Sequence, residues 1–141
     1  MKHLLLGGAL LSVGTLGAPV AAQAPVTFVS HERVAQGGTV VTAPNLIIQI
    51  NKRTETGMSE VHDKETDTFH ILSGSAVFVT GGEMIESKLT APGQYRGSGI
   101  KGGQTHTFTK GDVMVVPAGT PHWFKTVTEP IEYYVVKVIV P

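Results

Sequence analysis

The stretch GDVMVVPAGTPH, residues 111–122, sets the arrangement of the rest of the chain. A glycine-aspartate pair opens it as a predicted turn, and the mostly β-branched residues 113–116 predict a buried strand. Residues 117–121 contain two prolines and a glycine and predict a second, rigid turn. A new strand is therefore expected to begin at His122, with the turn before it fixing the direction of the imidazole.

Composition limits both the size of the protein and its partners. The 141 residues are enough for one domain, and 11 Lys and Arg balance 11 Asp and Glu without runs of one sign. No nucleic acid or anionic membrane surface is expected as a partner, since either would require a basic patch. The chain has no cysteine, so any metal must be held by nitrogen and oxygen ligands.

The N-terminus has the three parts of a secretory signal. Lys2 supplies a basic start, an apolar run of about a dozen residues follows, and small residues close the segment. The apolar run is shorter than the roughly 20 residues that span a bilayer. We therefore expect residues 1–22 to be a cleaved signal peptide and residues 23–141 to be a single periplasmic or extracellular domain without a membrane anchor.

A second informative stretch is GMSEVHDKETDTFHILSG, residues 57–74. Glu60 and His62 are two residues apart and share one face of a predicted strand. Residues 63–66 are polar and predict a turn, after which Asp67 opens a strand expected to end at Gly74. Because the strand after the turn can begin on either face, the Asp67 side chain can lie on the same face as those of Glu60 and His62.

These two stretches resemble the two motifs of the cupins. The first cupin motif is similar to H-x-H, three or four residues, E, six residues, G, and here Glu60 stands at the first histidine and Asp67 at the glutamate. Residues 111–122 resemble the second motif. The resemblance implies a small antiparallel jelly-roll β-barrel with Glu60, His62, Asp67 and His122 as metal ligands. Independently, frequent turn signals and the lack of long helical patterns indicate an all-β protein.

Two imidazoles and two carboxylates suit one divalent transition metal. Zn, Mn, Fe, Co and Ni all accept such nitrogen and oxygen ligands, and ligand type alone does not choose among them.

Three residues are weaker candidates for contacting a substrate, namely His106, Phe124 and Arg96. Arg96 lies in the glycine-rich residues 93–103, which we expect to be a plain connection, although a rim over the pocket is the alternative. His106 is either a contact in the site or, as we prefer, a neutral histidine hydrogen-bonded within a sheet.

Several segments are assigned no chemistry. Residues 26–29 predict a short strand, and residues 31–35 a brief helix capped by Ser30. His70, three residues after Asp67, is expected on the outer face. Residues 131–140 are apolar on both faces and predict a fully covered strand, from which Lys137 is expected to extend to a strand edge.

Two classes of function remain open. One is a metal-dependent enzyme of isomerase, lyase, hydrolase or dioxygenase type acting on a small molecule, which we slightly prefer. The other is a non-catalytic module that binds a sugar or another small molecule. A homodimer is expected in either case, because pairing buries the outer apolar faces of a small barrel.

Overall fold

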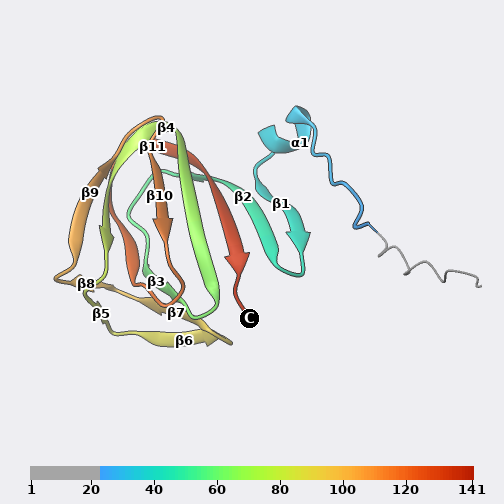
Figure 1. Cartoon of the computed structure of the whole chain (residues 1–141). Helices are drawn as coiled ribbons and strands as arrows, with labels where there is room; N and C mark the ends of the chain where they lie inside the picture. Colours follow the sequence, from blue (N-terminus) through green and yellow to red (C-terminus); the bar gives the residue numbers. More distant parts are fainter. Residues whose placement is uncertain (1–22) are drawn as a thin grey trace, which may run out of the picture.

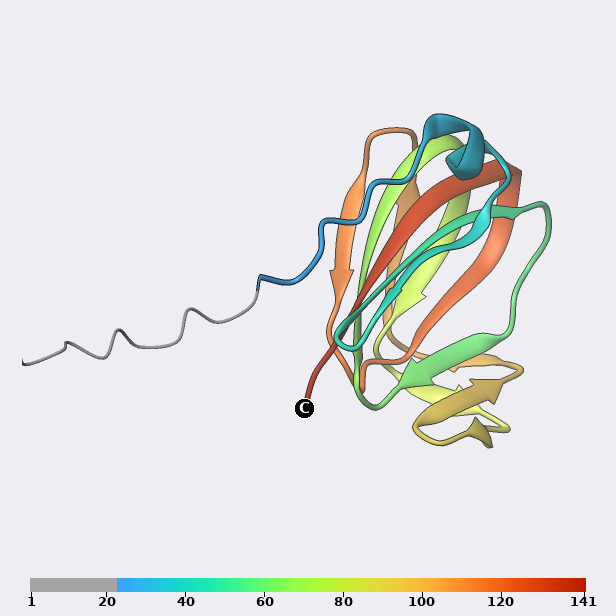
Figure 2. The ribbon, with the colours of Figure 1, turned by 90° about the vertical axis from the view of Figure 1, so that its right-hand side faces the viewer.

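The computed structural model describes residues 23–141. Its fold is built on two long antiparallel strands. The predicted signal peptide lies outside the described residues. Strands β4 (Glu65–Thr80) and β11 (His122–Ile139) pair from Thr80 opposite His122 to Glu65 opposite Ile139. Both bend so strongly that the sheet curls on itself (Figures 1 and 2). The prediction of an all-β antiparallel jelly roll is confirmed.

The remaining elements extend this pair on both sides. One path of hydrogen-bonded neighbours runs β1-β2-β11-β3-β7-β6, strands β9 and β10 pair with β4, and β5 and β8 form a small separate sheet. The bounds are α1 (His31–Ala35), β1 (Gly38–Ala43), β2 (Leu46–Arg53), β3 (Ser59–His62), β5 (Glu83–Ile85), β6 (Lys88–Ala91), β7 (Gln94–Gly97), β8 (Gly99–Lys101), β9 (Gln104–Phe108) and β10 (Val113–Val116).

Aromatic rings fill the interior of the curled sheet. Phe78 stacks on Phe108 with 4.7 Å between ring centroids, and Phe124 stacks on Tyr133 at 5.1 Å. Phe69 lies between the two pairs, 5.3 Å from Phe78 and 6.0 Å from Phe124. Packed rings of this kind contribute beyond the area that they bury. They form a rigid floor for the cavity described below.

Gly74 does not end a strand, contrary to the prediction. β4 continues through it to Thr80, and β11 passes so close that a Cβ on Gly74 would lie 2.0 Å from the Pro130 carbonyl oxygen. Its φ of +79° adds a left-handed conformation that favours glycine. Gly74 is therefore the point where the backbone of β11, at a shift in the pairing register, comes into close contact with β4.

The short helix at the N-terminus was predicted correctly, but the strand before it was not. Ser30 caps α1 and accepts a hydrogen bond of 3.4 Å from the Arg33 amide. Residues 26–29 are not in a strand, and Val26 and Phe28 are 96% and 86% exposed. An apolar run alone does not make a strand where no neighbouring strand offers hydrogen bonds. No helix within residues 23–141 has the length and apolar character needed to cross a bilayer.

Four strands in or near the second motif also differ from expectation. Residues 93–103 contain β7 and β8 rather than a plain loop. Val113 and Val115 of β10 are more than half exposed, so only one face of that strand is covered. β11 runs unbroken from the second motif to residue 139, and its outward Val138 is 42% exposed, so it is not fully covered either.

Candidate metal centre

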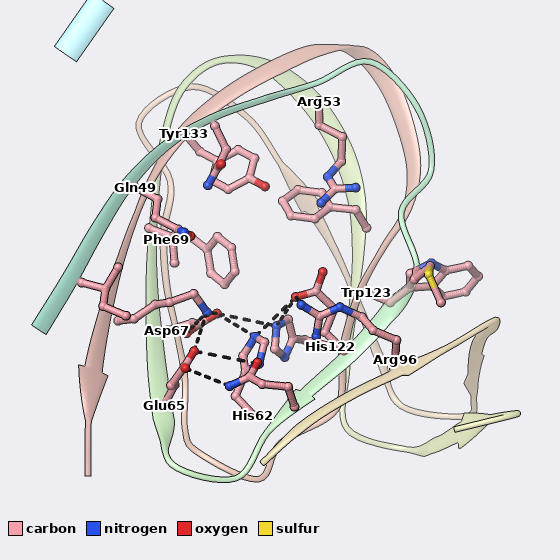
Figure 3. A pocket seen from close by; sticks show the side chains of 18 residues that line it. Gln49, Arg53, His62, Glu65, Asp67, Phe69, Arg96, His122, Trp123 and Tyr133 are labelled. Atoms are coloured by element: carbon pink, nitrogen blue, oxygen red, sulfur yellow. Dashed lines mark hydrogen bonds and ion pairs between the residues drawn. The ribbon is translucent and has the colours of Figure 1, made fainter. Parts of the chain in front are cut away.

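A cavity of about 350 Å³ opens into the curled sheet and contains all four predicted ligands. Strands β2, β3, β4, β7 and β11 supply its walls. Figure 3 shows His62, Glu65, Asp67 and His122 gathered at one end of the cavity, with Phe69, Tyr133 and Arg53 beyond them. The charged or imidazole-bearing lining residues are Arg53, Glu60, His62, Glu65, Asp67, Arg96, His122 and Lys137.

The turn before β11 orients His122. Gly119, at a φ of +77°, takes the left-handed position in a turn closed by the Thr120 amide on the Pro117 carbonyl at 3.1 Å. The Thr120 carbonyl then accepts a hydrogen bond of 3.0 Å from His122 Nδ1. Because a carbonyl can only accept, Nδ1 carries the proton and Nε2 holds a lone pair.

Burial supports the neutral form of this ring. It lowers the pKa of His122 below the ordinary 6.5, and the opposing effect of the Thr120 carbonyl is smaller. At neutral pH the Nε2 lone pair of His122 is thus available to a ligand.

A relay of two side chains orients His62 in the same way. Glu65 accepts a hydrogen bond of 2.8 Å from the Gln94 amide nitrogen, so the Gln94 oxygen faces His62 Nδ1 at 2.5 Å. That oxygen can only accept, so Nδ1 is again protonated and Nε2 again holds a lone pair. The same turn that orients His122 also fixes the backbone here, because the Gly119 amide donates to the His62 carbonyl at 2.8 Å.

Glu60 faces both free imidazole nitrogens. Its Oε2 lies 3.3 Å from His62 Nε2 and 3.9 Å from His122 Nε2. Burial raises the pKa of Glu60, but the Arg96 guanidinium beside it lowers that pKa, and the net shift is downward from the ordinary 4.5. Glu60 is therefore a carboxylate at neutral pH.

In this arrangement the Glu60 carboxylate, a hydrogen-bond acceptor, faces two imidazole nitrogens that are also acceptors. Both Nε2 atoms are buried and have no hydrogen-bond partner. Lone pairs and a carboxylate converging on one space repel one another unless a cation lies between them. Ligand atoms about 2.0–2.2 Å from a common ion lie about 3 to 3.5 Å from one another, close to the separations here. The residues fit a metal ion held by Glu60, His62 and His122.

Asp67 reaches the same space but is held by a lysine. Its Oδ2 is 3.5 Å from His62 Nε2 and 3.7 Å from His122 Nε2. Lys137 Nζ donates to both Asp67 oxygens at 2.8 Å and lies 3.0 Å from Glu65 Oε2. The ammonium thus already neutralises the carboxylate that the first motif offers as a ligand.

The prediction that Lys137 extends to a strand edge is wrong. Its side chain is 12% exposed and turns inward to two carboxylates. A charge inside an apolar strand signals a buried partner of opposite sign, and that signal was present in the sequence. Glu65 was missed because residues 63–66 were assigned to a turn. β4 in fact begins at Glu65, which places it on the same face as Asp67.

The weaker candidates divide between the cavity and the outside. Arg96 lies 3.6 Å from Glu60, and Phe124 lines the cavity wall. His106 lies in a different, smaller hollow, where its Nε2 is 3.0 Å from Thr80 Oγ1. It is therefore a hydrogen-bonded sheet histidine, the interpretation preferred above, and not a substrate contact in this cavity. His70 is exposed on the opposite face of β4, as expected.

Comparison with known proteins agrees with this description. The cupin family model matches residues 46–139, two thirds of the chain, and the protein therefore belongs to the cupin family. A search of curated proteins found no match.

Solved structures show the same fold at low identity. BH2720 from Bacillus halodurans is 14% identical with a TM-score of 0.57, over 86% of this chain and 88% of that one. TT1209 from Thermus thermophilus is 17% identical with a TM-score of 0.52, over 74% and 83%. The cupin domain of Cnp3 from Schizosaccharomyces pombe is 13% identical with a TM-score of 0.53, over 73% and 63%. At these identities the likeness concerns the fold alone.

Proposed function

We propose that this cupin binds one divalent transition metal, Zn, Mn, Fe, Co or Ni, and presents it to a small molecule in the cavity. The observation that carries the proposal is the pair of buried Nε2 atoms without hydrogen-bond partners, on His62 and His122. Each ring is tied back through Nδ1, and the Glu60 carboxylate faces both. This is how proteins fix the orientation of histidines that ligate metals.

The protein supplies three ligands and leaves the remaining positions of the ion open. A bound metal would act as a Lewis acid toward an oxygen of the small molecule. Arg96 lies beside the Glu60 carboxylate, and the Gln94 and Thr120 contacts hold Nδ1 of the two imidazoles so that each Nε2 faces the cavity. Open positions favour an enzyme over a storage site, because a closed set of ligands leaves no place for a substrate. A non-catalytic binding module is the alternative, and absence of turnover by the metal-loaded protein would favour it.

The test is metal content after reconstitution of the untagged chain with each of the five metals. We expect one equivalent in the wild type and none in His62→Ala or His122→Ala. Glu60→Ala should weaken binding severely and Asp67→Ala least, because Lys137 already holds Asp67. His70→Ala is the matched control, since it removes an exposed imidazole from β4, the strand that carries Asp67, and should keep full occupancy. Full occupancy in His122→Ala would overturn the proposal.

We also propose export of the chain, supported by the basic and apolar character of residues 1–22. Intact mass of the secreted or periplasmic protein should correspond to a start at Gln23. Recovery of the full-length mass from the cytosol would contradict this.

A further inference from the structure

The charges in the cavity do not all have partners. This inference builds on the proposed metal site and concerns what the cavity binds beside it. Lys137 pairs with Glu65 and Asp67, and Arg96 pairs with Glu60. Among the ion pairs of residues 23–141, none includes the third cation of the cavity, Arg53 of β2. One positive charge in the lining is therefore left without an acidic side chain.

Arg53 is nevertheless held in place. Its guanidinium carbon lies 4.9 Å from the centroid of the Phe124 ring, within the range of a cation-π contact. On the other side it packs against Gly57, where a Cβ would come within 2.3 Å of one guanidinium nitrogen. The Gly57 backbone is itself fixed to β11, because its amide donates to the Phe124 carbonyl at 3.1 Å and its carbonyl accepts from the Trp123 indole at 2.7 Å.

The guanidinium has a donor that the protein does not use. Arg53 Nε is buried and has no hydrogen-bond partner. A buried donor without an acceptor costs free energy, and the cost is larger for a charged group. Figure 3 shows the Arg53 side chain beside Tyr133 at the end of the cavity away from His62. Arg53 lines the cavity, so a ligand there would approach its guanidinium group.

Aromatic rings line the space between Arg53 and the metal ligands. Phe124, which contacts Arg53, is 6.0 Å from Phe69, and Phe69 is 6.1 Å from His122, all between ring centroids. A molecule spanning the cavity would therefore meet a cation at one end, apolar rings along its body and the metal centre at the other end.

We infer that Arg53 binds the carboxylate of a small organic acid whose far end reaches the metal centre. The planar guanidinium matches a carboxylate with two parallel hydrogen bonds. The three cations and three carboxylates of the lining already sum to zero, so a carboxylate ligand adds one negative charge, whereas a phosphate monoester at neutral pH adds nearly two. The apolar walls suit an acid with an aromatic or other apolar body.

The experiment uses matched acids and amides on metal-free protein at constant ionic strength. Benzoate and 4-hydroxybenzoate are titrated against benzamide and 4-hydroxybenzamide, with phenyl phosphate added as a third arm, and binding is followed by ¹⁵N NMR. We expect at least one acid to bind about tenfold more tightly than its amide and to shift the Arg53 Nε–H signal. Arg53→Gln should abolish this preference, and Arg53→Lys, which keeps the charge, should retain part of it.

Lys52→Gln is the matched control, since it removes a cation from the neighbouring position of β2. Lys52 points outward to Glu132 at 3.1 Å, so the acid should bind this variant as it binds the wild type. Equal binding of acid and amide, unchanged acid binding in Arg53→Gln, tighter binding of phenyl phosphate than of the acids, or no binding of either acid would each overturn the inference. The wild-type Arg53 signal provides the test even if Arg53→Gln does not fold.

Metal content of the same samples separates this inference from the proposed function. We expect Arg53→Gln to take up the same amount of metal as the wild type. If the wild type bound no metal while acid binding still depended on Arg53, the proposed function would fail and the inference on Arg53 would stand. If the wild type bound metal normally and acid binding did not depend on Arg53, the inference on Arg53 would fail and the proposed function would stand.

Discussion

At the scale of single residues, the metal centre depends on which imidazole nitrogen carries the proton. His122 receives its orientation locally, from the turn carbonyl two residues before it. His62 receives its orientation from β7, through Gln94, which is itself held by Glu65. Neither Gln94 nor Glu65 belongs to the spacing that identifies the motif, yet both decide whether His62 presents a lone pair.

Gln94→Ala should therefore weaken metal binding without unfolding the chain. Loss of a group that orients a metal-ligating histidine typically costs about 10–100-fold in affinity. Competition with a chelator of known affinity measures the change, and thermal melting shows whether the fold is intact. Thr90→Ala is a suitable control, because Thr90 bonds the Gln94 backbone and not its side chain. Unchanged affinity in Gln94→Ala would show that the relay has no role.

Lys137→Met should destabilise the metal-free protein. It would leave Glu65 and Asp67 side by side without their shared ammonium, and breaking a buried ion pair on one side costs about 3–5 kcal/mol. Added zinc should restore part of this stability, because Asp67 is then free to join the metal ligands. Urea unfolding with and without zinc gives both quantities. Lys52→Met, at an exposed pair, should cost no more than about 1 kcal/mol.

At the scale of elements, the site depends on the close contact between β4 and β11 at Gly74. Gly74 allows the Pro130 carbonyl to approach, so that the two strands stay paired on both sides of this contact. Asp67 lies on one arm of this pair and His122 on the other. The spacing of six residues between Asp67 and Gly74 thus fixes the position of Asp67 relative to the contact with Pro130.

Gly74→Ala should cost about 4 kcal/mol or more or prevent folding, because the new Cβ would overlap Pro130 backbone atoms. Gly81→Ala tests the contribution of backbone conformation alone. Gly81 also has a positive φ, at +70°, but no atom lies within 4 Å of its Cβ position. Gly81→Ala should lower the free energy of unfolding by only about 1–2 kcal/mol, the cost of a left-handed conformation for a residue with a Cβ. Equal losses of stability in the two variants, measured by urea unfolding, would contradict the contact with Pro130 as the cause.

The sequence predicted the turns of the two motifs better than the strands between them. Local spacing places His62, Asp67 and His122 on inward faces, and the structure brings all three to one cavity. The sequence alone could not predict which distant strands pair. β7 takes its position from β3 and thereby delivers Arg96, while Lys137 is inward because β11 pairs Lys137 with Asp67. Such contacts depend on sheet register and not on the local pattern.

At the scale of the whole molecule, the barrel leaves apolar side chains on its outside. Val113 and Val115 of β10 are 63% and 57% exposed and share one face, since they are two residues apart. Exposed apolar strand faces of this kind are typical of association sites. They support the predicted homodimer and suggest β10 as part of its contact.

Sedimentation should therefore give a dimer for the wild type and a monomer for the double variant Val113→Lys, Val115→Lys. The double variant should keep the metal, because neither Val113 nor Val115 lines the cavity. Thr107→Lys provides a control at another exposed strand position, on β9. A wild-type monomer at high concentration, or a dimer that survives both lysines, would contradict this assignment.

The central claim is that a metal ion lies between the two imidazoles and Glu60. An anomalous difference map from crystals loaded with zinc or manganese tests it most directly. We expect one strong peak about 2.0–2.2 Å from Nε2 of both His62 and His122 and from a Glu60 oxygen, with the Lys137–Asp67 pair intact beside it. A loaded crystal with no peak there, or with the two Nε2 atoms bonded to protein or water instead of an ion, would contradict it.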